Sequence, residues 1–250
     1  MSGTRRTFIE SVGVLGAAAV VGGLSEASAS PQQLDSSRSV PPKAPEIHCV
    51  VTGRNKAGKS VIASNAPAKS VTVALFPGYQ FYRLWGSDSS PALPSDGTPT
   101  SQSGWFPPKN SFRFGFFTLP PATSTKVEPI ATPAALEEVR QKLPGILDAL
   151  EPDPPGMHTT DSVDFDVVVF GEVVMELDDG AEVVLKAGDC VIQNGTRHAW
   201  HNRSSDKCVI AFSLVARSVK GNPSGRKEIL DGETRRLHSL TKMPFSFRPG

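Results

Sequence analysis

Two short blocks of the sequence contain side chains that can bind a metal ion or transfer a proton. Residues 156–171 include His158 and Asp164, and residues 188–202 include His198. Imidazole nitrogens and carboxylate oxygens suit divalent metals as well as general acid–base chemistry. His158 and Asp164 are an even number of residues apart, so an unbroken strand would direct both side chains to one face.

A third block, GRNKAGKS at residues 53–60, matches the phosphate-binding pattern G-x-x-x-x-G-K-[ST]. That chemistry requires a helix to begin at the lysine, within a parallel βαβ unit. The following residues, 61–67, are β-branched at first and end at Pro67. We therefore expect a hairpin turn here and no bound nucleotide.

Short apolar runs between turn residues predict an all-β protein with many antiparallel strands. Asp179-Gly180 is a strong hairpin signal between two such runs. The proline-rich stretch 86–110 is expected to be a long irregular loop. The strands are expected at residues 49–51, 60–63, 71–76, 79–85, 112–119, 165–170, 173–177, 181–186, 190–193, 198–201 and 208–215.

One helix interrupts the strands. Thr132 is a suitable N-cap and Pro133 suits the first helical position. Apolar residues then recur every three or four positions as far as Leu150, and Pro144 must kink or divide the helix. We expect its apolar stripe to pack on the outside of a sheet rather than to bind a partner.

The first two blocks resemble the two motifs of the cupin superfamily. Those motifs read H-x-H, three or four residues, E, six residues, G, and then G, a short strand, P-x-G-x-x-H-x-x-x-N. The resemblance implies a double-stranded β-helix, a jelly-roll barrel whose motif residues point inward, here with one inserted amphipathic helix. The wider sequence is similar to a bacterial and fungal subgroup of single-domain cupins, and some fungal members are described as oxidoreductases in polyketide pathways.

The resemblance also implies a set of metal ligands. His158 matches the first histidine of motif one, Thr160 falls on the second, Asp164 on the glutamate, and His198 on the histidine of motif two. Two histidines and one carboxylate are the composition of a non-haem iron site, and zinc, manganese and nickel remain open. The alternative is a barrel that has lost its metal, with both histidines hydrogen-bonded in a polar pocket.

Three further residues are assigned to the substrate pocket. Thr160 would leave room for substrate at the place of the missing histidine. Gln193 stands where motif two usually has proline, and Trp200 shares the strand parity of His198 and could stack on a ligand.

Composition and the N-terminal residues restrict the partners and the location. Lys and Arg number 26 against 25 Asp and Glu, which argues against nucleic acid as a partner. Three cysteines are too few for a disulfide framework and are expected to be buried thiols. Arg5-Arg6, an apolar run over 12–24 and an A-x-A site ending at Ala29 resemble a Tat signal peptide. Export to the periplasm or medium without stable membrane insertion is therefore expected.

The expected organisation has six parts: a signal peptide at 1–29, a flexible arm at 30–47, strands completing or covering the barrel at 48–125, a helical insertion at 126–155, the cupin core at 156–216 and a C-terminal arm at 217–250.

These features predict an exported cupin with a small-molecule pocket. The first expectation is a metal-dependent oxidoreductase or dioxygenase acting on an aromatic or polyketide-like compound. The alternatives are a lyase or isomerase, a metal-free cupin that binds a sugar or organic acid, and a homodimer whose arm, residues 30–60, exchanges onto a neighbouring sheet.

Overall fold

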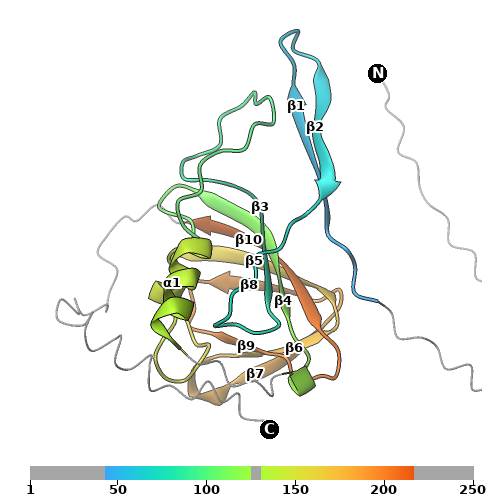
Figure 1. Cartoon of the computed structure of the whole chain (residues 1–250). Helices are drawn as coiled ribbons and strands as arrows, with labels where there is room; N and C mark the ends of the chain where they lie inside the picture. Colours follow the sequence, from blue (N-terminus) through green and yellow to red (C-terminus); the bar gives the residue numbers. More distant parts are fainter. Residues whose placement is uncertain (1–42, 125–130, 217–250) are drawn as a thin grey trace, which may run out of the picture. The chain divides into compact units, whose positions relative to one another are not determined.

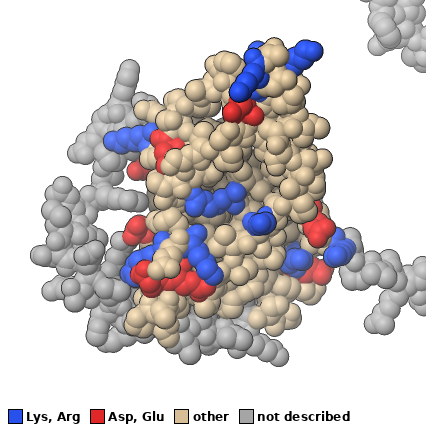
Figure 2. Space-filling model, turned by 45° about the horizontal axis from the view of Figure 1, so that its top comes forward, with Lys and Arg blue, Asp and Glu red and all other residues tan. Residues whose placement is uncertain are grey.

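The computed structural model describes residues 43–124 and 131–216. The expected signal peptide, most of the N-terminal arm and the C-terminal arm lie outside these residues, so export remains a prediction. Within the described ranges, no helix has the length and apolar character needed to cross a bilayer. Figure 2 shows one face of the molecule, on which small groups of both charge signs are separated by uncharged surface.

Two antiparallel sheets form the body of the protein (Figure 1). The five-stranded sheet has the order β3 (Gln80–Ser87), β4 (Phe112–Leu119), β10 (Cys208–Ala216), β5 (Ser162–Phe170) and β8 (Cys190–Asn194). The three-stranded sheet has the order β7 (Glu182–Lys186), β6 (Glu172–Glu176) and β9 (Ala199–His201). From β5 onward the chain passes repeatedly between the sheets, which is the double-sheet jelly-roll arrangement. The all-β prediction is confirmed.

Alternation along each strand decides what lies between the sheets. On β5, Asp164, Asp166 and Val168 are buried, whereas Phe165 and Val167 are exposed. Val168 packs in a buried cluster with Leu119, Val173, Leu185 and Ile210, which come from both sheets. This cluster joins the sheets at one end of the interior.

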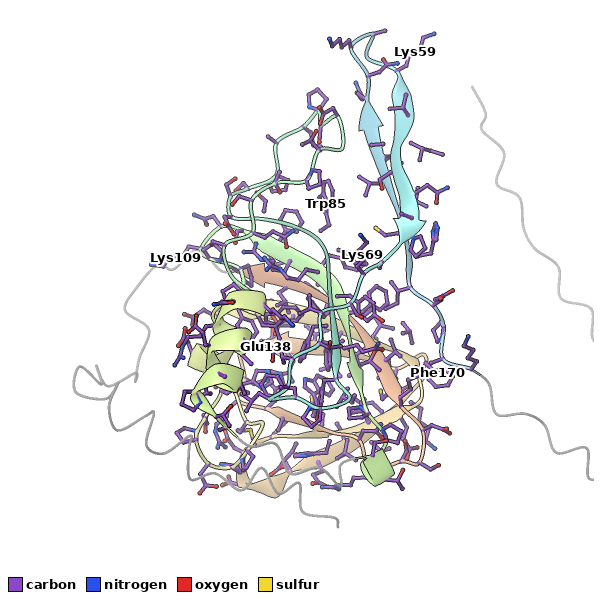
Figure 3. All side chains as sticks on the ribbon, in the orientation of Figure 1. Lys59, Lys69, Trp85, Lys109, Glu138 and Phe170 are labelled. Carbon is purple, nitrogen blue, oxygen red and sulfur yellow. The ribbon has the colours of Figure 1, made fainter. Side chains whose placement is uncertain are left out.

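The phosphate-loop-like block forms a hairpin. β1 (His48–Arg54) pairs with β2 (Ser60–Pro67), and the Asn55 side chain accepts hydrogen bonds from the backbone N–H groups of Ala57 and Lys59, both at 3.0 Å. The predicted turn is confirmed, and a strand rather than a helix follows Lys59. In Figure 1 the hairpin stands away from the jelly roll, and Figure 3 shows Lys59 at its tip.

The helical segment is divided as its proline requires. α1 (Pro133–Lys142) begins at Thr132, whose hydroxyl accepts a hydrogen bond from the Ala135 N–H at 3.1 Å. α2 (Ile146–Ala149) follows Pro144 and Gly145, and Gly145 adopts a left-handed φ of 83°.

The apolar stripe of this segment does not pack on the outside of a sheet. Leu136, Val139 and Leu143 are buried in a cluster with Phe212 and Leu214 on the inner face of β10. Among the described residues, no member of this cluster comes from the three-stranded sheet. The helices therefore cover an inner surface that the shorter sheet leaves open.

The prediction of a strand at residues 71–76 is wrong. Only Val71 forms a bridge, to Phe81, and the chain then turns before β3. Val73 and Leu75 are buried beneath the helices, while the Ala74 N–H donates to a Glu138 carboxylate oxygen at 2.8 Å. Residues 71–76 are therefore held by packing under α1 and not by the hydrogen bonds of a sheet.

The predictions for the loops, turns and cysteines are confirmed in part. The stretch between β3 and β4 is an irregular loop, as predicted, and 3-10 turns lie at Ala122–Ser124 and Asp178–Gly180. The second turn closes the β6–β7 hairpin. Of the cysteines, Cys208 is buried but Cys190 is exposed, because it occupies an outward position on the edge strand β8.

Candidate functional site

His158 and His198 face each other across a two-residue bridge. The backbone N–H of each residue donates to the carbonyl oxygen of the other at 2.9 Å, and the ring centroids are 4.2 Å apart. His158 follows the helical segment and His198 immediately precedes β9. The fold thus brings together histidines that are 40 positions apart in the sequence.

Backbone carbonyls select the tautomer of both rings. Nδ1 of His158 lies 3.0 Å from the Gly156 carbonyl oxygen, and Nδ1 of His198 lies 2.9 Å from that of Thr196. A carbonyl oxygen only accepts hydrogen bonds, so Nδ1 carries the hydrogen and Nε2 carries the lone pair in each neutral ring.

Burial keeps both imidazoles neutral. It lowers the pKa of His158 to about 4, and the neighbouring His198 acts in the same direction. Burial also lowers the pKa of His198. At neutral pH the two rings therefore present two Nε2 lone pairs and no net charge.

Two carboxyl groups from β5 lie on the same interior face. Thr160 donates to one oxygen of Asp164 at 3.1 Å, and the Ser162 hydroxyl donates to the other. Burial raises the pKa of Asp164, although these hydroxyls oppose the shift. Burial, with Asp164 nearby, raises the pKa of Asp166 to about 8, so at neutral pH Asp166 is mostly a hydrogen-bond donor.

The histidines and carboxyls form the polar end of an interior cavity of about 200 Å³. Most of its wall is aromatic or aliphatic and comes from β3, β4, β10, the helical segment and the two loops that flank β3. The lining residues are Leu75, Phe76, Pro77, Tyr79, Phe81, Trp105, Phe106, Phe117, Leu119, Ile146, Leu150, Gly156, His158, Asp164, Asp166, His198, Trp200, Phe212 and Leu214.

The irregular loop before β4 supplies part of this wall. Trp105 donates its backbone N–H to the Pro144 carbonyl at 2.7 Å, and its ring makes an edge contact with Phe81 at 5.4 Å between centroids. The buried Arg113 donates to the Gly104 carbonyl at 3.1 Å and forms an ion pair with Asp88. These contacts hold the aromatic residues of the loop over the cavity.

The expected metal ligands only partly form one donor set. The two Nε2 atoms suit a divalent cation, and their Nδ1–carbonyl bonds are the usual way to orient a metal-binding imidazole. Asp164 lines the same cavity, but both of its oxygens accept hydrogen bonds from hydroxyl groups. Within the described ranges, no three His, Cys, Asp or Glu side chains are arranged to hold one metal ion. His158 and His198 each offer an Nε2 lone pair, and the three-residue set with Asp164 stays a prediction.

The expected pocket residues take different positions. Trp200 lines the cavity, with its ring 5.7 Å from that of His198 in a T-shaped contact. Thr160 is buried and contacts Asp164 rather than forming the cavity wall. Gln193 is also buried beside the cavity, where it contacts the Met175 sulfur at 3.0 Å and accepts from Thr196.

Some residues of the site were not assigned from the sequence. Asp166 has the same parity as Asp164, which could have placed it on the interior face. Trp105 and Phe106 are adjacent aromatic residues in a proline-rich loop, which is a weaker signal. Their role depends on the contact between this loop and the helical segment.

The strand order, together with histidines of two motifs facing each other in the interior, defines the jelly-roll fold of the cupin class. No family model matches the chain.

Curated relatives match a limited part of this sequence. It is 45% identical over 67 residues to phomopsin biosynthesis cluster protein C' of Diaporthe leptostromiformis, covering 25% of this chain and 35% of that protein. It is 44% identical over 61 residues to oryzines biosynthesis cluster protein J of Aspergillus oryzae, covering 24% and 34%. A cupin-domain-containing oxidoreductase, virC of Hypocrea virens, is 37% identical over 46 residues, covering 18% and 24%. The matches thus span about a third or less of each relative.

Solved structures with a similar arrangement include cupin domains. The Cnp3 cupin domain of Schizosaccharomyces pombe has a TM-score of 0.35 at 10% identity, covering 68% of this chain and 87% of that one. The putative ethanolamine utilization protein Q of Salmonella typhimurium has a TM-score of 0.33 at 13% identity, covering 70% and 99%. The fold assignment rests on the strand order and not on these overlaps.

Proposed function

We propose that this protein binds a small, mainly aromatic molecule in the interior cavity, with a neutral polar group of that molecule against His158 and His198. One observation carries the proposal: the wall of the cavity is mainly aromatic, and His158, His198, Asp164 and Asp166 lie near one another within it. Binding pockets typically combine such an apolar wall with a few convergent polar groups that fix orientation.

The cavity volume supports a single substituted ring as the bound group. An apolar cavity of about 150 Å³ is known to accept benzene. The cavity here is about 200 Å³, which leaves room for one or two substituents. A larger compound would extend beyond the cavity.

The polar end favours a hydroxyl or carbonyl over a carboxylate. The lone pairs on Nε2 of His158 and His198 can accept a hydrogen bond from a phenol. Asp164 and Asp166 place two carboxyl groups beside them, and no Lys or Arg is among the described lining residues. A bound carboxylate would lack a cationic partner in a buried site.

We expect a monocyclic phenol such as p-cresol to raise the thermal unfolding midpoint of the purified protein. Binding to the folded state alone stabilises it by about 2.7 kcal/mol at a ligand concentration of 100 times Kd. Benzoate and glucose should give no comparable shift. Titration calorimetry would give the affinity for p-cresol.

Two variants separate cavity binding from surface binding. Phe106→Ala removes a ring 6.5 Å from His158 and should weaken p-cresol binding about tenfold or more. Phe170→Ala removes an aromatic ring outside the cavity lining and should leave the affinity unchanged. Equal effects of both variants, or a preference for glucose, would contradict the proposal.

A second candidate is a metal-dependent oxidoreductase, supported by the two Nε2 lone pairs and by the partial likeness to a cupin-domain oxidoreductase. A divalent metal at His158 and His198 would supply Lewis-acid or redox chemistry when bound. The protein's own contribution would be to orient both rings through their backbone contacts and to hold an aromatic compound beside them.

Metal content of protein purified without chelator tests this candidate. If this candidate holds, the protein should contain iron, manganese, zinc or nickel near one equivalent, and both His158→Ala and His198→Ala should lose the metal. His48→Ala, on the outlying hairpin, is the matched control and should retain it. Metal that persists in the two site variants would show that it binds elsewhere.

A further inference from the structure

Of the described residues that line the interior cavity, Tyr79 is the one that carries a hydroxyl group. Its ring stacks on Phe81, with 6.2 Å between the centroids and an interplanar angle of 14°. Phe76 makes an edge contact with the same ring, also at 6.2 Å. The ring packs against both buried clusters of the interior. These contacts fix the ring and therefore restrict where its hydroxyl can lie.

The Tyr79 hydroxyl makes no hydrogen bond to any group within residues 43–124 and 131–216. Burial raises the pKa of this hydroxyl, so it stays protonated and able to donate a hydrogen bond. A buried tyrosine hydroxyl usually has a partner, because a buried polar group without one costs free energy. The cavity wall thus carries a hydrogen-bond donor that the described protein does not use.

Tyr79 joins the cavity wall away from the histidines. An added Cβ on the preceding Gly78 would lie 2.8 Å from the Pro120 Cβ, and the Asn202 side chain donates to the Pro120 carbonyl at 2.9 Å. His198 and Asn202 flank β9 on its two sides. Four residues of extended chain cover roughly 13 Å. The backbones of Tyr79 and His198 therefore lie near opposite ends of β9.

A rigid ring with an oxygen at each end matches this separation. A phenol whose hydroxyl contacts the Nε2 atoms of His158 and His198 has its para position on the opposite side of the ring. An oxygen attached there could accept a hydrogen bond from Tyr79. An oxygen at the ortho position would stay beside the histidines.

We propose that Tyr79 is a second binding point in the cavity, and that the ligand is a para-substituted phenol whose second oxygen accepts a hydrogen bond from the Tyr79 hydroxyl. This inference rests on the binding function proposed above and specifies its ligand class. The second oxygen belongs to a neutral group, such as an alcohol or a carbonyl, because no Lys or Arg is among the described lining residues.

Titration calorimetry with 4-hydroxybenzyl alcohol and 4-ethylphenol tests the proposal. The two compounds have nearly the same shape and differ by a hydroxyl in place of a methyl group. Tyr79→Phe should weaken binding of the alcohol about tenfold, because the buried hydroxyl of the ligand loses its partner. The affinity for 4-ethylphenol should stay the same or increase.

Tyr82→Phe is the matched control. Tyr82 is the other tyrosine of the chain, lies outside the cavity lining, and has its hydroxyl 3.5 Å from the Gln80 side-chain oxygen. Its substitution should leave both affinities unchanged. The meta isomer, 3-hydroxybenzyl alcohol, should respond little to Tyr79→Phe, because its second oxygen is not opposite the phenol hydroxyl.

Thermal unfolding without ligand provides an independent readout. Tyr79→Phe should unfold at the wild-type temperature or above it, because it removes a hydroxyl that has no partner. A lower midpoint would show that the hydroxyl is bonded within the protein, and would overturn the proposal.

Equal losses of affinity for both para compounds, or an unchanged affinity for the alcohol, would also overturn the proposal. If wild type binds 4-ethylphenol in either case, the binding function proposed above still stands. Binding of neither compound by wild type would contradict both.

Discussion

The surroundings of His158 keep its imidazole uncharged at neutral pH. Its ring contacts His198 and Phe106, and Asp164 and Glu151 act on it electrostatically. Because its pKa falls to about 4 in the folded state, the unfolded chain binds this proton more readily between pH 4 and 6.5. Stability from this group is therefore present at neutral pH and lost as the pH falls.

We expect the stability difference between wild type and His158→Asn to shrink by roughly 1–2 kcal/mol between pH 7.5 and 5. The asparagine amide can still donate to the Gly156 carbonyl but cannot bind the proton. Urea unfolding at the two pH values measures the difference. The pKa of Asp166 is raised, so its titration makes the folded state less stable as the pH rises. Comparing wild type with His158→Asn removes this contribution, because both proteins contain Asp166. A parallel decline in both proteins would contradict the assignment to His158.

At the scale of elements, the connection from β5 to β6 depends on Gly171. Its φ is 75°, and an added Cβ would lie 2.4 Å from the Lys207 carbonyl oxygen. Gly180, in the β6–β7 turn, has a similar φ of 72° but no atom within 4 Å of an added Cβ. A side chain at Gly171 would therefore meet both backbone strain and a steric clash, whereas one at Gly180 would meet backbone strain alone.

Gly171→Ala should lower the free energy of unfolding by about 2–4 kcal/mol, because strain and contact add. Gly180→Ala should cost only about 1 kcal/mol, from the left-handed conformation alone. Denaturant midpoints at constant m-value measure both. Equal losses would show that the chain relaxes away from the Lys207 contact.

At the scale of the whole molecule, the five-stranded sheet has an apolar surface on both sides. Phe212 and Leu214 of β10 face the cavity and helices, whereas Val215 faces outward. The sequence of β10 is CVIAFSLVA and contains one polar residue, so apolar and polar residues do not alternate along this strand. The inner side lines the cavity in which we propose that the small molecule binds.

Elements whose signals are local could be predicted from the sequence. Turn glycines, most strand runs and the Thr132-Pro133 helix start correspond to observed elements, because caps and turns are decided within a few residues. The motif pattern also identified His158 and His198 as members of one site, because both stand at histidine positions of the two motifs.

Contacts between distant segments could not be predicted from the sequence, because they depend on how the elements pack. The 71–76 segment has strand composition, yet burial of Val73 and Leu75 beneath the helices outweighs local preference. Trp105 and Phe106 reach the cavity through long-range contacts, such as the hydrogen bond from the Trp105 N–H to the Pro144 carbonyl. These outcomes depend on distances between residues far apart in the chain, which spacing and composition do not encode.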